Sequence, residues 1–306
     1  MSSNLKISEW FDIWYDSQTH IKQSTKSIYQ SYANKHLKPK MGTVRLKKLS
    51  RDLIQQFIDE LSIKLSPKTV RAVYSMLKLC LTAAYEKHLI GNVVDKICLP
   101  KTVSKDVKVL TKQEQKRLEQ VIEAENKEND IGILICLYTG IRIGELCALK
   151  WENINLDRKI MTIDKTMYSV QSNDGKCKTK IILSSPKSVN SERDIPIAEL
   201  LSEKLSKIQK SEGFVINRNG KYIEPAVYSR RYKKLLEKAG IEYMMFHSTR
   251  HTFSVRAREL GVDVQTLSEI LGHSSVSTTL NFYGHSLPEH KHNQMERIGG
   301  LFSQSK

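Results

Sequence analysis

Apolar residues recur at helical spacing along most of this 306-residue chain, whereas the stretch 159–197 has a different character. Ile7, Trp10 and Trp14, for example, fall on one face of a helix. The exceptional stretch has the composition of short strands at 159–164, 178–184 and 192–197, separated by turn-rich segments at 173–175 and 186–191. The sequence therefore predicts a mainly α fold with one small antiparallel β-sheet.

Capping residues mark several helices in the first third of the chain. A helix is expected over 25–36, closed by Pro39 and Gly42. Ser50 is placed to cap a helix at 51–63, and Ser66, with a proline after it, opens the clearest helix of the chain. That last helix has an apolar stripe made of Val70, Val73, Leu77, Leu81 and Ala84.

A break near residue 100 indicates two domains, as the length of the chain also does. Gly91 and Pro100 interrupt the helical pattern, and Thr111 with Glu114 forms a capping box that opens a new helix. We therefore expect an all-α domain over 1–92, a linker over 93–108, and a mostly α domain with the small sheet over 109–306.

The net charge points to a polyanionic partner. The chain holds 49 Lys and Arg against 33 Asp and Glu, a formal charge of +16. Nucleic acid is the partner that this balance favours, although a basic protein without such a partner is the alternative. Lys68, Arg71 and Lys78 form a basic stripe on the clearest helix; they are expected on DNA phosphates, or otherwise on a solvated face.

Other features exclude several classes of protein. The five cysteines are scattered without a C-x-x-C pair, so neither a disulfide framework nor a cysteine zinc site is indicated. The longest apolar run, 131–138, falls short of the ~18 residues of a membrane span, and the N-terminus lacks a signal-peptide core. We expect a protein of a reducing, intracellular setting without a membrane role.

Two short patterns contain residues that suit phosphate chemistry. Arg142 and Glu145 lie three residues apart, so the carboxylate can hold the guanidinium; a surface ion pair is the alternative. His247, Arg250 and His251 share another helical face, a pair of histidines that resembles a zinc helix. The glutamate that follows the first histidine of a metalloprotease helix is absent, and a phosphate-binding His/Arg group fits a basic protein better. Capping and core packing are the alternative.

Two more positions gain meaning from their order along the chain. Tyr283 follows the Leu-Gly-His sequence of His273 by ten residues, and Lys187 lies in the expected turn between two strands. Alone, a tyrosine is usually a packing residue and a turn lysine is usually solvated.

Taken together, these patterns resemble the tyrosine recombinase (phage integrase) family, most closely the integrases of phages and conjugative transposons. The resemblance covers nearly the whole chain, from the helices at 7–90 onward, and includes T-G-I-R-x-G-E-L and S-x-R-D-I-P-I sequences. It implies a two-domain DNA clamp: an all-α, SAM-like core-binding domain and a catalytic domain with a C-terminal tail helix. All six catalytic positions of the family have a matching residue: Arg142, Lys187, His247, Arg250, His273 and Tyr283.

The proposed nucleophile and charge-stabilising residues make chemical sense. A tyrosine ester of the DNA phosphate preserves the bond energy between cutting and resealing, so neither ATP nor a metal is required. Arg142 and Arg250 would clamp the negative charge of the five-coordinate phosphorus, with Glu145 orienting Arg142 or a histidine. The resemblance implies attachment of Tyr283 to the 3′-phosphate and release of a 5′-hydroxyl.

Proton transfer is assigned to three further residues. His247 is placed to assist the phenol proton, and His273 to donate to a phosphate oxygen. Lys187 is expected to protonate the leaving deoxyribose oxygen as a general acid.

We therefore expect a site-specific DNA recombinase that cuts and rejoins strands without a cofactor or metal. The alternatives are type IB topoisomerase-like relaxation, a DNA-binding regulator on a recombinase scaffold, and a metal-dependent hydrolase that uses His247 and His251. The resemblance implies double-stranded DNA as partner, a homo-oligomer that is tetrameric in the synaptic complex, and accessory DNA-bending or excision factors. It also implies a DNA-associated protein of the prokaryotic cytoplasm.

Overall fold

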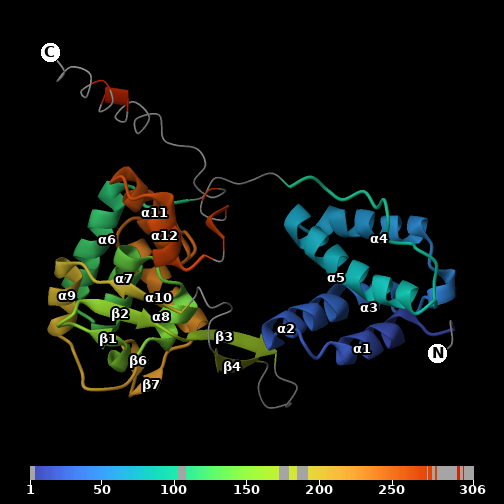
Figure 1. Ribbon diagram of the computed structural model, residues 1–306, viewed down its shortest axis with the longest axis horizontal. Coiled ribbons are helices and arrows are strands. Elements are labelled where there is room, and N and C mark those ends of the chain that lie inside the picture. Colours follow the sequence, from blue (N-terminus) through green and yellow to red (C-terminus); the bar gives the residue numbers. More distant parts are fainter. Residues whose placement is uncertain are drawn as a thin grey trace. The chain divides into compact units, whose positions relative to one another are not determined.

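The computed structural model describes residues 4–102, 108–171, 179–184, 192–273, 275–277, 280, 295–296 and 299 (Figure 1). The chain divides into two compact units. One comprises Met1–Lys105 and Ser169–Lys180, and the other comprises Asp106–Tyr168 and Ile181–Lys306. Lys187, Tyr283, the expected turns at 173–175 and 186–191, and nearly all of the expected tail helix lie outside the described residues.

The first unit is built from helices around an aromatic core. Trp10 and Phe11 of α1 are almost completely buried, and the Trp10 indole Nε1 donates to the Cys80 carbonyl of α5 at 2.9 Å. Ser50 and Ser66 cap α4 and α5 with their hydroxyl groups, as their positions predict. The helices are α1 (Ile7–Ser17), α2 (Gln23–Tyr32), α3 (Lys38–Met41), α4 (Arg51–Lys64) and α5 (Pro67–Glu86).

The expected end of a helix at Pro39 is wrong, whereas Gly42 does follow the last helical residue, Met41. Helix α2 passes at Ala33 into a π-helical segment, Ala33–Leu37, and the chain continues as α3 through Pro39. Pro39 lies in the first turn of α3, where its missing N–H costs little, and the wider π turn before it relaxes the i to i−4 pairing. The proline therefore marks a change of helix type and not a stop.

Helix α5 shows the two faces that its sequence predicts. The apolar residues Val70, Val73 and Leu77 are completely buried, whereas the basic stripe of Lys68, Arg71 and Lys78 is exposed. The Arg71 Nε donates to the Pro100 carbonyl at 3.0 Å, so this arginine also holds the segment that follows the helix.

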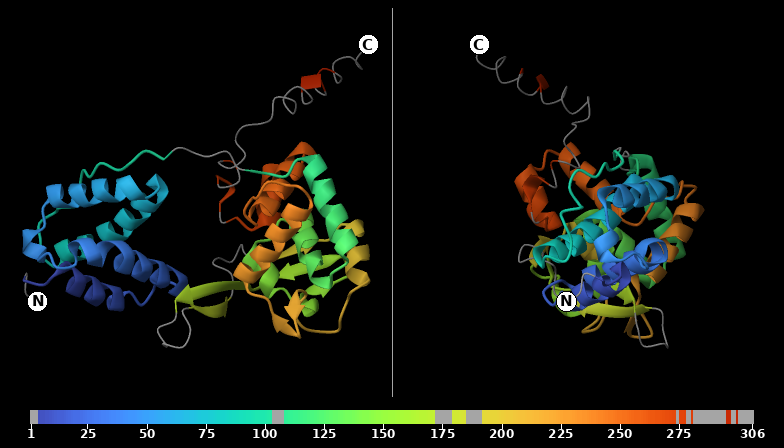
Figure 2. Two further views of the ribbon diagram at one scale, coloured as in Figure 1. Left: turned by 180° about the vertical axis from the view of Figure 1, so that it is seen from behind. Right: turned by 90° about the vertical axis from the view of Figure 1, so that its right-hand side faces the viewer.

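The second unit is centred on an apolar helix. Helix α7 (Ile131–Thr139) is buried nearly all round and packs against α8 (Ile143–Ala148), α9 (Glu199–Ser206) and α11 (Ser248–Glu259). Figure 2, in the colours of Figure 1, shows α11 and α12 (Val264–Leu271) at the end of the unit away from most of its strands. The remaining helices are α6 (Lys112–Glu125), capped by Thr111 as predicted, and α10 (Pro225–Lys238).

The strands of this region pair differently from the prediction of one sheet. Strands β1 (Ile154–Asn155), β2 (Ile160–Ile163) and β5 (Arg193–Pro196) form one antiparallel sheet, whereas β3 (Thr166–Gln171) pairs with β4 (Thr179–Ser184). Strand β3, which supplies the partner of β4, was not predicted from the sequence. The expected turn with Lys187 falls between β4 and β5 in the sequence and lies outside the described residues. A third pair joins β6 (Asn217–Arg218) to β7 (Lys221–Tyr222).

The described cysteines Cys80, Cys98, Cys136 and Cys147 are free, and three of them are buried. Among the described helices, none has the length and apolar character needed to cross a membrane.

Candidate active site

The N-terminus of α8 holds the predicted Arg142–Glu145 pair. The Arg142 backbone N–H and its Nη1 donate to the two Glu145 carboxylate oxygens at 2.9 and 2.8 Å. The Glu145 side chain is only 3% exposed, so the pair is not a surface ion pair. Just before it, Gly140 has φ +69°, and a Cβ there would lie 2.5 Å from the Phe253 ring and 2.8 Å from Leu271. Only glycine suits this tight entry to α8.

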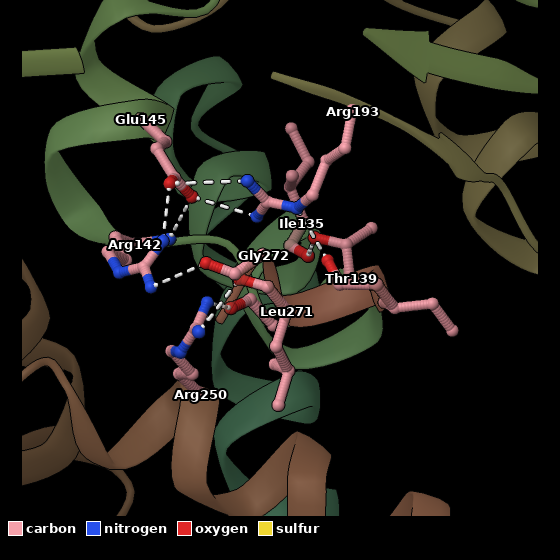
Figure 3. A network of polar contacts seen from close by, with 10 residues as sticks. Ile135, Thr139, Arg142, Glu145, Arg193, Arg250, Leu271 and Gly272 are labelled. Atoms are coloured by element: carbon pink, nitrogen blue, oxygen red, sulfur yellow. Dashed lines mark hydrogen bonds and ion pairs between the residues drawn. The ribbon is translucent and has the colours of Figure 1, made fainter. Parts of the chain in front are cut away.

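Helix α11 brings a second arginine to the same place. Arg250 is 3% exposed, and its Nη1 and Nη2 donate to the carbonyls of Gly140 and Leu271, each at 2.8 Å (Figure 3). His247, at the start of the helix, keeps part of its surface in contact with solvent and makes no side-chain capping hydrogen bond, which argues against capping or full burial in the core for it. Its ring stands edge-to-face on His251, with centroids 4.6 Å apart.

The C-terminal end of α12 completes the cluster. The Arg142 Nη2 donates to the Gly272 carbonyl at 3.2 Å, one residue beyond the Leu271 carbonyl that Arg250 binds. Gly272 has φ +64°, and the His273 backbone N–H returns to the Ser268 carbonyl at 3.1 Å. His273 is thus fixed directly beside the residue that Arg142 holds.

Arg193 also belongs to this site. It lies in the S-x-R-D-I-P-I sequence but was not among the predicted site residues. Its Nη2 and Nη1 donate to the Glu145 carboxylate at 3.1 and 3.3 Å, and its Nε donates to the Ile270 carbonyl at 2.6 Å (Figure 3). The alternation of side chains along β5 could have indicated its position, because Arg193 lies two residues before the buried Ile195 and therefore on the same face of the strand.

The site carries excess positive charge while its histidines stay neutral. Burial, followed by His251 and then by Arg250 and Arg142, lowers the pKa of His247 to about 4. Burial, followed by Arg250 and Arg142, lowers the pKa of His273 to about 4. Burial raises the pKa of Glu145, but Arg193 and Arg142 outweigh burial and hold it below its usual range. Two guanidinium groups bind this carboxylate, and a third, that of Arg250, binds backbone carbonyls of the same cluster. The resulting excess of positive charge is suited to an incoming anion.

The structure brings together five of the predicted site residues, Arg142, Glu145, His247, Arg250 and His273. Lys187 and Tyr283 lie outside the described residues, and Lys68, Arg71 and Lys78 belong to the first unit. In the described parts of the chain, no group of three or more His, Cys, Asp or Glu residues is placed to hold a metal ion. A site of this kind on a basic, mostly helical chain defines a protein that acts on nucleic-acid phosphates.

Comparison with known proteins gives the family. Residues 108–290 match the model of the phage integrase family, and residues 6–62 match the phage integrase N-terminal SAM-like domain. The chain therefore belongs to the phage integrase family of tyrosine recombinases. A tyrosine recombinase XerC-like protein of Caldanaerobacter subterraneus subsp. tengcongensis is 29% identical over 264 residues, which are 78% of this chain and 67% of that protein.

Solved structures share the fold. The Tn1549 transposon integrase in complex with a circular intermediate DNA has a TM-score of 0.81 at 19% identity, covering 96% of this chain and 99% of that one. A λ integrase tetramer bound to a Holliday junction gives a TM-score of 0.68 at 16% identity, covering 93% and 80% of the two chains.

Proposed function

We propose that this site-specific recombinase cuts and rejoins DNA through a covalent 3′-phosphotyrosine, with Tyr283 as the nucleophile. The observation that carries the proposal is the cluster of Arg142 and Arg250 around the end of α12, beside two neutral histidines. The Arg142 side chain is 36% exposed, so part of its guanidinium is accessible to a DNA phosphate. Both arginines would stabilise the charge that develops on the phosphate oxygens.

The remaining roles follow from the protonation states. A neutral His247 can accept the phenol proton of the nucleophile, and His273 can donate a hydrogen bond to a phosphate oxygen. Glu145, held ionised by Arg193 and Arg142, orients Arg142. Lys187 is proposed as the acid that protonates the leaving 5′ oxygen. Exchange of one phosphodiester for another needs no metal or cofactor, and the alternatives of a regulator, a topoisomerase or a hydrolase are not favoured.

The partners are double-stranded DNA and further copies of the chain. The proposal takes its support from the λ integrase relative, which was solved as a tetramer on a Holliday junction. We propose the same assembly here, with the segment 288–306 docking on a neighbouring subunit, and accessory DNA-bending or excision factors as additional partners. The first unit would place Lys68, Arg71 and Lys78 on DNA phosphates. The bacterial relative supports action on DNA in the prokaryotic cytoplasm.

Covalent trapping tests the proposed function. The protein is incubated with a library of randomised, nicked duplexes, in which cleavage near a nick releases a short fragment and prevents resealing. After denaturation, the DNA that remains on the protein is sequenced and the linked peptide is identified by mass spectrometry. We expect a recurring target sequence joined by its 3′-phosphate to the peptide that contains Tyr283. Absence of covalent DNA, or linkage to another residue, would contradict the proposal.

Binding to the trapped target should depend steeply on salt. If about 6–10 phosphates are neutralised, affinity should fall roughly 40- to 500-fold between 100 and 200 mM salt because counterions are released. Lys78→Gln should reduce the slope of log affinity against log salt by about 1, because Lys78 is exposed on the basic stripe of α5. A flat salt titration measured by fluorescence anisotropy would contradict the phosphate-dominated mode of binding.

Affinity should also rise as the pH falls from 8 towards 6. In the free protein His247 and His273 gain protons only near pH 4, because burial and the arginines disfavour their charged forms. A phosphate bound between Arg142 and Arg250 offsets that positive charge and raises both pKa values. The complex then binds more protons than the free protein, so affinity increases by up to about tenfold per pH unit for each proton taken up.

The control for this pH dependence is the double variant His247→Gln with His273→Gln. It should lose most of the pH slope of the dissociation constant and keep the salt slope, with His251 retained as the background titrating group. An unchanged pH slope would assign the proton uptake to other residues.

A further inference from the structure

Three consecutive carbonyls at the C-terminal end of α12 each accept a hydrogen bond from a different arginine (Figure 3). Arg193 binds the Ile270 carbonyl at 2.6 Å, Arg250 binds the Leu271 carbonyl at 2.8 Å, and Arg142 binds the Gly272 carbonyl at 3.2 Å. The last carbonyls of a helix lack intrahelical partners and lie at the negative end of its dipole, so guanidinium groups stabilise them well.

Arg193 differs from the other two arginines because it contacts both the helix end and Glu145. Its side chain is 7% exposed, and two of its N–H groups bind the two oxygens of the carboxylate that also receives Arg142. Since Glu145 is 3% exposed, its two guanidinium partners decide its position. The orientation of Arg142 is therefore coupled to Arg193 through a shared carboxylate.

The backbone around Gly272 is fitted to this arginine. A Cβ at Gly272 would lie 2.8 Å from the Arg193 Nη1 and 3.0 Å from its Cζ. The guanidinium thus packs directly against the turn that leads from α12 to His273. Through these contacts Arg193 connects the start of β5 with Arg142 and with the segment of His273.

We propose that Arg193 is a positioning residue of the strand-cleavage reaction: it aims Arg142 at the scissile phosphate through Glu145 and fixes His273 through the end of α12. This inference rests on the proposed function, because it assigns Arg142 to the reacting phosphate. Arg193 does not itself touch the DNA in this assignment. Its effect on the rate is exerted through the residues that it holds.

A purely structural ion pair is the competing explanation, and the same unit supplies a matched example. Arg231 donates through its Nε to the buried Asp130 at 2.7 Å and also pairs with Glu125. No described contact links Arg231 with Arg142, Glu145 or His273. Loss of this arginine should affect folding stability without a specific effect at the phosphate.

The test compares Arg193→Met, Arg193→Lys and Arg231→Met on the trapped target sequence. Single-turnover cleavage and the dissociation constant are measured on normal DNA and on DNA with a methylphosphonate at the scissile position. The methyl group removes one phosphate charge, so cleavage of this DNA depends less on a correctly aimed Arg142. We expect Arg193→Met to slow cleavage of normal DNA about 10- to 100-fold, with less than threefold change in binding.

On methylphosphonate DNA, the fold reduction in cleavage rate caused by Arg193→Met should be less than a third of that on normal DNA. The same is expected of Arg142→Ala. Adding Arg193→Met to Arg142→Ala should slow the reaction by less than a further threefold, because both act on one interaction. Arg193→Lys retains the charge without the planar fork and should recover only part of the rate.

Each other outcome has a defined meaning. The positioning role is overturned if Arg193→Met reduces the cleavage rate by the same factor on both DNAs, as expected of Arg231→Met. It is also overturned if Arg193→Met cleaves normal DNA as fast as the parent protein. If Arg193→Met fails to fold, Arg193→Lys carries the comparison, and equal losses on the two DNAs again overturn the role. Failure of the parent protein to cleave any DNA would instead refute the proposed function.

Discussion

Tyr283→Phe should abolish covalent attachment to DNA and leave DNA binding within about twofold of the parent protein. The substitution removes one hydroxyl oxygen, the atom that would form the ester, and retains the ring, so no alternative nucleophile is created. The arginines proposed to bind the phosphate, Arg142 and Arg250, lie elsewhere in the chain and remain. The measurement is a denaturing gel of protein incubated with nicked target DNA, in which the covalent band should fall below detection.

The described tyrosines near the site provide the matched control. Tyr228 and Tyr232 are buried, and burial raises the pKa of both phenols, so neither is accessible to DNA. Tyr243 is 52% exposed and lies four residues before His247, which makes it the alternative nucleophile to eliminate. Tyr243→Phe should retain the covalent band. Loss of the band in Tyr243→Phe together with its persistence in Tyr283→Phe would reverse the assignment.

The features that sequence predicted well are local ones. The caps at Ser50, Ser66 and Thr111 depend on hydrogen bonds to residues three positions away, and the structure confirms all three. The contact between Arg142 and Glu145 also spans three residues and was predicted from spacing alone. In each case one helical turn brings the groups together, so the pattern of residues contains the geometry.

The features that sequence did not predict depend on contacts between distant segments. The Arg193 guanidinium meets the Ile270 carbonyl 77 residues away, and Arg250 meets the Gly140 carbonyl 110 residues away. Strand pairing is likewise non-local: β2 pairs with β5, and β4 pairs with the unpredicted β3. Residue types and turn signals specify strands but do not specify their partners, so one sheet was expected where the structure has separate pairings.

Lys187 lies outside the described residues, but its place in the sequence limits its distance from the site. Lys187 precedes Arg193 by six residues, so the two Cα atoms are at most about 20 Å apart. Arg193 itself is held by contacts to Glu145 and to the Ile270 carbonyl. Lys180 is the alternative general acid, because it is the described lysine nearest to Lys187 in the sequence. It lies on β4, in the sheet that does not contain Arg193.

Lys187→Ala should slow cleavage of normal DNA by ~10²–10⁴, the usual range for loss of a general acid. The leaving 5′ alkoxide is strongly basic and needs a proton, which a lysine ammonium carries at neutral pH. Replacing the bridging 5′ oxygen with sulfur creates a thiolate that departs unprotonated, so this DNA should restore most of the rate of Lys187→Ala. Single-turnover cleavage of the two DNAs provides the measurement.

Two variants separate proton donation from phosphate binding in this experiment. Arg142→Ala should remain slow on the sulfur DNA, because the charge on the non-bridging oxygens still needs its guanidinium. Lys180→Ala should cleave both DNAs at nearly the parent rate. If Lys187→Ala is equally slow on oxygen and sulfur DNA, the lysine contributes to binding and another group supplies the proton; if Lys180→Ala shows the sulfur rescue instead, the acid lies on β4.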